Sequence, residues 1–197
     1  MLTLERWFPT IVGYKINPSH DELETELTNH CYNIQDTVES GGNDWISNST
    51  YNTSSGNHDC LSDSKFAKLN EWVIATVNEY ADELKISKPL IPQSSWFNVY
   101  NRYDYQEFHA HPGAHISAIY FLKGSEDGAK VYFKDNTNDM LNIKYNEGTN
   151  DNFGSVHYKP LPGMLVMFLS NTYHAVERHD VTDERISLSY NFLQVAP

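Results

Sequence analysis

Cysteine and positive charge are what this sequence has least of. Its 197 residues include only Cys31 and Cys60, which lack the paired spacing of a zinc site and are too few for a disulfide scaffold. Asp and Glu number 26 against 14 Lys and Arg, which gives a formal net charge of -12. Because no dense Lys/Arg cluster offsets this charge, a polyanion would be repelled, and we expect no nucleic-acid partner.

Long apolar runs are missing as well. No segment approaches the roughly 20 apolar residues of a membrane-spanning helix. The first residues, "MLTLERWFPTIVGYKI", lack the basic start and apolar core of a secretory signal. We therefore expect a cytoplasmic protein without a membrane partner. With 40% hydrophobic and 13% aromatic residues, the chain can form a packed interior, and its length fits a single domain over residues 1–197.

Apolar spacing predicts two helices in the first half of the chain. Within residues 17–40 and 62–84, apolar side chains recur every three or four positions, as on one face of a helix. These side chains are Leu23, Leu27, Cys31 and Ile34 in the first segment, and Phe66, Leu69, Val73, Val77 and Tyr80 in the second. Residues 7–16 predict a short strand or two, and the polar residues 41–57 predict a long surface loop with a short strand near 49–53.

The second half of the chain has the composition of strands. From Trp96 onward, β-branched and aromatic runs alternate with turn residues, and these runs occupy 95–103, 116–124, 129–135, 164–170 and 185–195. Strands that follow helices without regular βαβ alternation indicate an antiparallel sandwich or barrel. We expect a mainly β fold of the α+β class, in which N-terminal strands and supporting helices (1–90) brace a core at 95–193.

The last predicted strand, "RISLSYNF", has one polar and one apolar face. Arg185, Ser187, Ser189 and Asn191 alternate with Ile186, Leu188, Tyr190 and Phe192. Side chains two apart in a strand share a face. The polar face either meets water or lines a polar pocket inside a barrel while the apolar face packs beneath the helices. This strand alone leaves both interpretations open.

Histidines supply the clearest candidate for a metal site. His109 and His111 lie two apart in "EFHAHPGAHIS", so they share a face if the chain is extended there. His174 follows an apolar strand farther on, and as a third ligand it would complete one face of an octahedron. Glu107 has the same parity and is an alternative ligand to His111. We place His115 outside the ligand set.

The order of these residues resembles the iron(II)/2-oxoglutarate-dependent oxygenases. His109-x-His111-Pro, the strand at 116–124, a Gly-x-Leu-x-x-Phe strand, His174 and Arg185-x-Ser187 follow one another as in that superfamily, over about residues 96–193. The nearest likeness is to a subgroup from phages and bacteria with an H-x-H-P motif. The resemblance implies a double-stranded β-helix, a cupin-like jelly roll, that uses Fe(II), 2-oxoglutarate and O2. More often this superfamily has Asp or Glu where His111 stands.

The resemblance also implies a role for each site residue. His109, His111 and His174 would hold iron. Arg185 would pair with the distal carboxylate of the small-molecule cosubstrate, 2-oxoglutarate, and Ser187 would add a hydroxyl. Further cosubstrate contacts would come from Tyr120, Asn98 and Tyr100. The implied reaction is oxidative decarboxylation of 2-oxoglutarate coupled to hydroxylation of a substrate.

The primary substrate is not evident from the sequence. The prolyl-hydroxylase branch of the superfamily makes a protein or peptide side chain plausible by analogy, and the acidic composition favours a neutral or basic partner. Residues 41–57 and 136–160 would form the rim of the site. Two other functions remain open: a cupin-like three-histidine metal dioxygenase that does not use 2-oxoglutarate, and a non-catalytic jelly-roll binding module.

Overall fold

The structure, a computed structural model, describes residues 3, 9–42, 45–87, 89–134, 144, 146–150 and 152–194. Parts of the predicted strands (7–8, 135 and 195) and of the predicted rim (43–44, 136–143, 145 and 151) lie outside these residues. The elements in chain order are β1 (Val12–Ile16), α1 (His20–Gln35), β2 (Tyr51–Asn52), the 3-10 turn η1 (Ser64–Phe66), α2 (Ala67–Glu83), β3 (Leu90–Tyr100), β4 (Gln106–His109), β5 (Ile116–Lys123), β6 (Val131–Lys134), β7 (Ser155–Tyr158), β8 (Met164–Leu169), β9 (His174–Val176) and β10 (Arg185–Gln194).

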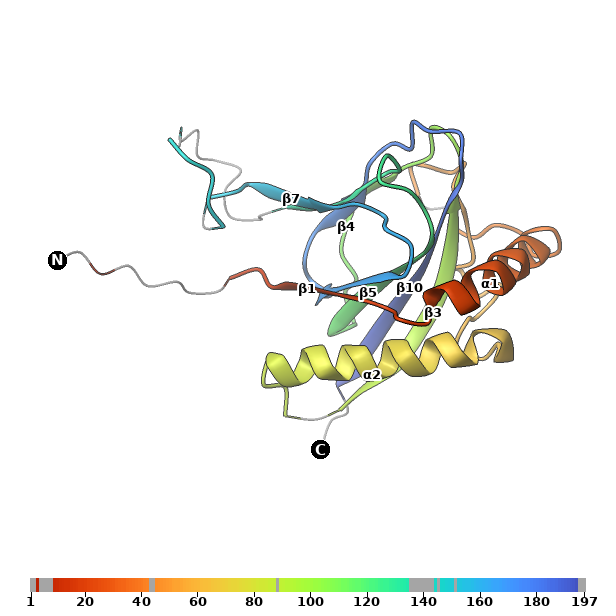
Figure 1. Cartoon of the computed structure of the whole chain (residues 1–197), viewed down its shortest axis with the longest axis horizontal. Coiled ribbons are helices and arrows are strands. Elements are labelled where there is room, and N and C mark those ends of the chain that lie inside the picture. The colour runs from red at the N-terminus through yellow and green to blue at the C-terminus, as the bar shows by residue number, and fades with distance from the viewer. Residues whose placement is uncertain are drawn as a thin grey trace.

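Two antiparallel sheets form the body of the protein. The larger sheet has the order β1-β8-β5-β10-β3-β2, and the smaller has the order β4-β9-β6-β7. Figure 1 shows β4 and β7 on one side of the large sheet and both helices on the other. The two predicted helices and the five strands predicted after Trp96 are confirmed, whereas β4, β7 and β9 were not predicted. The predicted antiparallel pairing is confirmed too, since every strand pair described here runs antiparallel.

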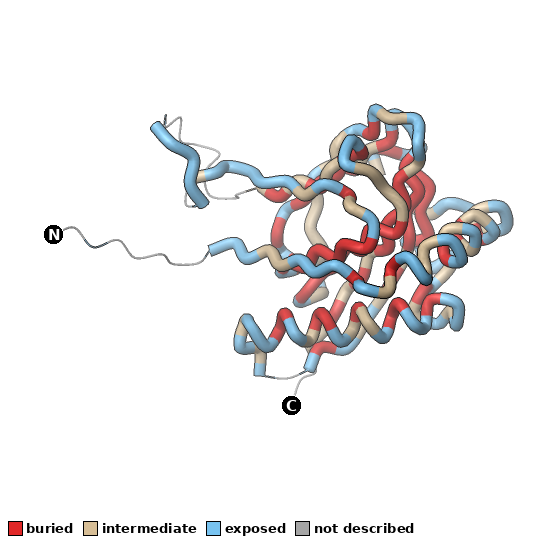
Figure 2. Tube along the Cα trace, in the orientation of Figure 1, coloured by how far each residue is buried: buried red, intermediate tan, exposed pale blue. Residues whose placement is uncertain are grey.

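Two apolar clusters hold these layers together. One lies between the helices and the large sheet, and its members include Leu27, Val73, Leu188 and Tyr190. The other lies between the two sheets and includes Phe121. In Figure 2, α1 and α2 are buried only on the side that faces the sheet, as the apolar spacing predicted. None of the described helices is long and apolar enough to cross a membrane.

Both cysteines are part of the helix-facing core. Cys31 and Cys60 are fully buried and unbridged. Burial raises the pKa of both thiols, which keeps them in the neutral form. Their place in the core fits the small number of cysteines, because each acts as a small apolar side chain.

The prediction of a surface loop over 41–57 is partly wrong. Tyr51–Asn52 forms the expected short strand, pairing with β3. However, Ser47, Thr50, Asn52 and Thr53 are buried. Their side chains bond the backbone and one another, as in the Thr50 hydroxyl donated to the Tyr105 carbonyl at 3.1 Å. Polar composition suggested a solvated segment, but these hydrogen bonds allow it to pack against the sheet.

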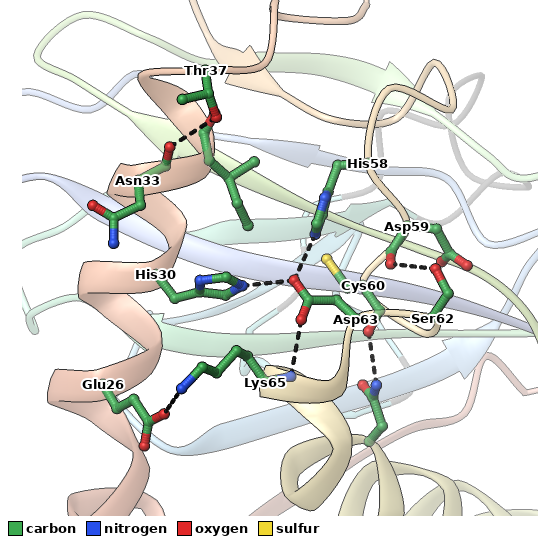
Figure 3. Close-up of polar contacts among 12 residues, drawn as sticks. Glu26, His30, Asn33, Thr37, His58, Asp59, Cys60, Ser62, Asp63 and Lys65 are labelled. Atoms are coloured by element: carbon green, nitrogen blue, oxygen red, sulfur yellow. Dashed lines mark hydrogen bonds and ion pairs between the residues drawn. The ribbon is translucent and has the colours of Figure 1, made fainter.

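A carboxylate shared by two histidines joins α1 to the segment before α2. Asp63 Oδ2 lies 2.6 Å from His30 Nε2 and 3.1 Å from His58 Nε2 (Figure 3). Asp63 Oδ1 accepts from the Lys65 backbone N–H, so it caps η1. Burial disfavours ionisation of Asp63, but the hydrogen bonds from His30 and Lys65 prevail and lower its pKa. His58 is held here with its ring facing the outer cleft described below.

Gly163, in the turn just before β8, has a conformation that other residues adopt with strain. Its φ is +81°, and an added Cβ would lie 2.8 Å from His20 Cβ. We therefore expect Gly163→Ala to reduce the free energy of unfolding by about 1–3 kcal/mol. Chemical denaturation measures the loss. The matched control is Gly154→Ala, where an added Cβ meets nothing within 4 Å. Equal stability of the two variants would contradict the expected strain.

Candidate active site

Three histidines meet between the sheets, two from the paired strands β4 and β9 and one, His111, from the segment just after β4. His109 ends β4 and lies opposite His174, the first residue of β9. The ring centres are 4.2 Å apart for His109 and His174, 5.0 Å for His109 and His111, and 5.1 Å for His111 and His174. One ring nitrogen of each lies within 4.8 Å of the others, and no other group among the described residues meets this criterion for a metal site.

Backbone hydrogen bonds fix which nitrogen is available in two of these rings. His109 Nδ1 lies 2.8 Å from the Glu107 carbonyl oxygen, and His174 Nδ1 lies 3.0 Å from the Thr172 carbonyl oxygen. Because a carbonyl only accepts, each Nδ1 must carry the proton and donate it. The Nε2 of each ring then keeps a free lone pair. Metal-binding histidines are usually oriented by this arrangement.

Burial keeps the three imidazoles in the neutral form that binds metals. It lowers the pKa of His109, and it lowers the pKa of His174 still further. Burial, with His109 as a smaller influence, lowers the pKa of His111 to about 4. The cluster contains no carboxylate. A divalent ion held by it would therefore keep its full charge for an anionic ligand.

These pKa values predict how the stability of the metal-free protein depends on pH. A histidine in the unfolded chain has a pKa near 6.5, above its value in the folded protein. As the pH falls below about 6.5, the unfolded chain therefore binds protons that the folded chain does not. The stability that neutral His111 contributes is therefore fully present above pH 6.5, and it is lost as the pH falls from 6.5 to about 4, the pKa of His111 in the folded protein. The melting temperature should fall less between pH 7 and pH 5 in His111→Gln than in the parent protein. Equal falls would contradict this.

Arg185 is a buried cation without an anionic partner. Its side chain is fully buried at the start of β10. The guanidinium carbon lies 4.5 Å from the centre of the Tyr100 ring and 5.1 Å from that of Phe121. Nη1 makes one long bond of 3.4 Å to the Ser187 hydroxyl, while Nε and Nη2 have no partner. Among the described residues no carboxylate pairs with Arg185, and a buried unpaired charge is costly, so the site fits an anionic ligand.

The inner pocket joins the histidine cluster to Arg185. Its walls come from both sheets, and the predicted residues Asn98, Tyr100 and Ser187 are among them. Asn98 Nδ2 donates to the Ser189 hydroxyl at 3.3 Å, while its Oδ1 has no partner. The polar face of the last strand therefore faces this pocket, and its apolar face packs against the helices. Of the two interpretations of that strand, the pocket is confirmed.

Tyr120 does not belong to the pocket, and this prediction was wrong. Along β5, Ile119 and Phe121 face the space between the sheets, whereas Tyr120 faces the helices. Its hydroxyl lies 2.8 Å from His20 Nδ1, next to α1. Side chains alternate along a strand, so a residue between two pocket-facing neighbours must point away.

Glu107 and His115 both lie outside the histidine cluster. Glu107 Oε1 accepts from the Ile46 backbone N–H at 2.9 Å. The register of β4 against β9 shifts between Gln106 and His109. Because this irregularity interrupts the alternation of side chains, Glu107 need not share a face with His109 although the two are two residues apart. His115 is exposed, and its Nδ1 accepts from the Gln194 backbone N–H.

An outer cleft of about 520 Å³ opens beside the histidines and was not predicted as a pocket. It shares with the inner pocket the side chains of Trp45, Trp96, Gln106, His109 and His111. The Trp96 ring centre lies 5.6 Å from that of His111. The sequence placed Trp96 on a strand and residues 41–57 at the rim of the site, and Trp45, Thr53, Ser54 and Gly56 of that segment do line the cleft. No described residue of 136–160, the other predicted part of the rim, lines it. No local pattern indicated that Trp45 would reach the inner pocket as well.

The chain is similar to known proteins in a family signature and in its fold. Residues 94–191 match the family model described as "Putative 2OG-Fe(II) oxygenase". No curated protein shows a significant sequence match to the chain.

Solved structures of prolyl hydroxylases share the fold. A prolyl-4-hydroxylase of Pseudomonas putida has a TM-score of 0.65 at 14% identity, over 95% of this chain and 94% of the other. A Trichoplax adhaerens prolyl hydroxylase, in complex with a peptide fragment of the oxygen degradation domain of hypoxia inducible factor, has a TM-score of 0.67 at 13% identity, over 93% and 83%. A viral collagen prolyl hydroxylase from Paramecium Bursaria Chlorella virus-1, in complex with 2OG, has a TM-score of 0.55 at 13% identity, over 92% and 96%. The predicted double-stranded β-helix is thereby confirmed.

Proposed function

We infer that this chain, whose residues 94–191 belong to the iron(II)/2-oxoglutarate oxygenase family, is a hydroxylase that converts 2-oxoglutarate to succinate. The observation that carries the inference is one pocket that holds both a cluster of three histidines and an unpaired buried arginine. A metal ion bound by the cluster would account for the free lone pairs of His109 and His174. A dicarboxylate would account for the unpaired donors of Arg185.

The residues of the pocket have separate tasks in this reaction. His109, His111 and His174 would hold Fe(II), which supplies activation of O2 when bound. Arg185, with Ser187 beside it, would bind the distal carboxylate of 2-oxoglutarate and fix its orientation. Asn98 offers an unpaired acceptor to the same ligand. The net reaction converts 2-oxoglutarate, O2 and a substrate C–H group into succinate, CO2 and a C–OH group.

Burial of the pocket protects this chemistry from water. Ile119 and Val176 form apolar walls beside the histidines. The rings of Tyr100 and Phe121 pack against the fully buried Arg185 guanidinium and exclude water from it. Electrostatic contacts are stronger in such a dry site, so the arginine can orient a carboxylate firmly.

A protein or peptide side chain is our proposal for the substrate. The outer cleft adjoins the histidines and is open to solvent, so an extended segment can approach the site. The Trichoplax adhaerens relative was solved with a peptide. We further propose that residues 1–197 form one domain in the cytoplasm. A single cooperative unfolding transition would support one domain. Recovery of the tagged protein in the cytoplasmic fraction of lysed cells would support the location.

Metal analysis combined with succinate measurement tests the proposed function. We expect about one iron per chain after anaerobic reconstitution, and succinate formed from added 2-oxoglutarate in the presence of O2. The all-histidine cluster favours one alternative, a metal dioxygenase that binds iron and does not use 2-oxoglutarate. Iron without succinate would support that alternative. Failure to bind iron at all would leave a non-catalytic binding module.

A further inference from the structure

The outer cleft differs in charge from the inner pocket. Among its lining residues are the acids Asp59 and Glu107, and no Lys or Arg belongs to the described lining. The inner pocket has the opposite character, because its one charged side chain is Arg185. An anionic cosubstrate is therefore attracted to the inner end. The outer end suits a ligand that is cationic or rich in hydrogen-bond donors.

Glu107 offers this ligand an unused carboxylate oxygen. Oε1 accepts from the Ile46 backbone N–H, whereas Oε2 is buried and has no partner. A buried carboxylate oxygen without a donor is unfavourable, so a donor from a bound ligand would stabilise it. The hydrogen bond to Ile46 also holds the carboxylate in place, so little entropy is lost when a ligand binds.

The neighbouring groups of the cleft favour the same kind of ligand. Gln106 Oε1 is a second buried acceptor without a partner. The indoles of Trp45 and Trp96 line both the cleft and the inner pocket. Indole faces attract ammonium and guanidinium groups and pack well against alkyl chains. Carboxylate, amide oxygen and indole together match a flexible chain that ends in a positive charge.

We propose that the outer cleft binds an alkyl chain ending in an ammonium or guanidinium group, as in lysine or arginine, with the charge at Glu107. Binding of this chain is a property of the cleft alone. Its hydroxylation rests on the proposed function: a C–H bond of the chain becomes C–OH while 2-oxoglutarate and O2 become succinate and CO2. The chain can belong to a free amino acid or to a residue of a peptide.

Binding of blocked amino acids tests the proposal directly. The probes are Nα-acetyl-lysine amide, Nα-acetyl-arginine amide and the uncharged Nα-acetyl-norleucine amide, titrated by NMR into metal-free protein and into protein loaded with Mn(II) and 2-oxoglutarate. We expect a cationic probe to bind at least about tenfold more tightly than norleucine in both states. Equal affinities would overturn the proposal. Because the metal-free arm needs no catalysis, failure of the proposed function would not affect it.

Glu107→Gln separates the charge of Glu107 from its structural contact. Gln retains an oxygen that can accept from Ile46, so the fold should persist while the preference for the cationic probes disappears. Glu126→Gln removes one charge from an exposed ion pair with Lys159 and should leave that preference intact. Trp45→Leu, the second variant, should weaken arginine-probe binding several-fold. An unchanged preference for the cationic probes in Glu107→Gln would overturn the proposal, and so would an unchanged affinity of Trp45→Leu for the arginine probe.

A second comparison identifies the molecule to which the alkyl chain belongs. It measures the binding of free lysine and arginine against that of the pentapeptides Gly-Gly-Lys-Gly-Gly and Gly-Gly-Arg-Gly-Gly. Tighter binding of a free amino acid would support the proposal with a small-molecule substrate, and tighter binding of a pentapeptide would support it with a protein substrate. If neither type binds more tightly than Gly-Gly-Nle-Gly-Gly, where Nle is norleucine, the cleft does not recognise the charge.

Discussion

Arg185→Met is expected to weaken 2-oxoglutarate binding by roughly thirtyfold to several thousandfold, because truncating one partner of a buried charge pair costs about 2–5 kcal/mol. In the free protein Nε and Nη2 of this arginine have no partner, so the distal carboxylate has no competitor for them. Calorimetric titration of 2-oxoglutarate into Mn(II)-loaded protein measures the affinity.

We expect Arg185→Met to weaken cosubstrate binding without lowering the stability of the free protein. Met can occupy the space between Tyr100 and Phe121 without burying an unpaired charge. The free protein should therefore unfold at the same temperature or a higher one. Arg178→Met, at an exposed arginine paired with Asp180, is the matched control and should change neither property. Retained 2-oxoglutarate affinity in Arg185→Met would show that another group binds the cosubstrate.

His111→Ala is expected to weaken iron binding by more than about 100-fold, because removal of groups that merely orient a metal ligand already costs about 10–100-fold. His111→Asp should keep iron bound, since a carboxylate can replace one imidazole in such a site. Equilibrium dialysis against limiting Fe(II) without O2 measures both affinities.

His115→Ala is the control for the His111 variants, since His115 is exposed and outside the cluster. It should bind iron as the parent protein does. If His111→Ala retained its iron while Glu107→Ala lost it, Glu107 rather than His111 would be the third ligand.

Two features of the site were predictable because they are local patterns in the sequence. The alternation from Arg185 to Phe192 separated the polar from the apolar side chains of β10, because side chains two apart in a strand share a face. It left open whether the polar face met water or lined a pocket. The spacing of His109 and His111 placed two rings close together. His174 was a candidate ligand because it follows an apolar strand, but its approach to the other two histidines depends on the pairing of β9 with β4, which no local pattern shows.

Tyr120 and Trp45 show what the sequence could not reveal. Ile116 to Leu122 are all buried, so β5 lacks the polar alternation that would indicate which face Tyr120 occupies. Trp45 reaches the site through tertiary contacts: the backbone N–H of the next residue, Ile46, bonds the Glu107 side chain across 61 positions of sequence. No local spacing encodes a contact of that kind.

A crystal structure with Mn(II) and 2-oxoglutarate tests the proposed active site most directly. We expect a metal ion bound by His109, His111 and His174, with the distal carboxylate of 2-oxoglutarate on Arg185. A metal bound through Glu107 in place of His111, or a 2-oxoglutarate molecule that does not contact Arg185, would contradict these assignments.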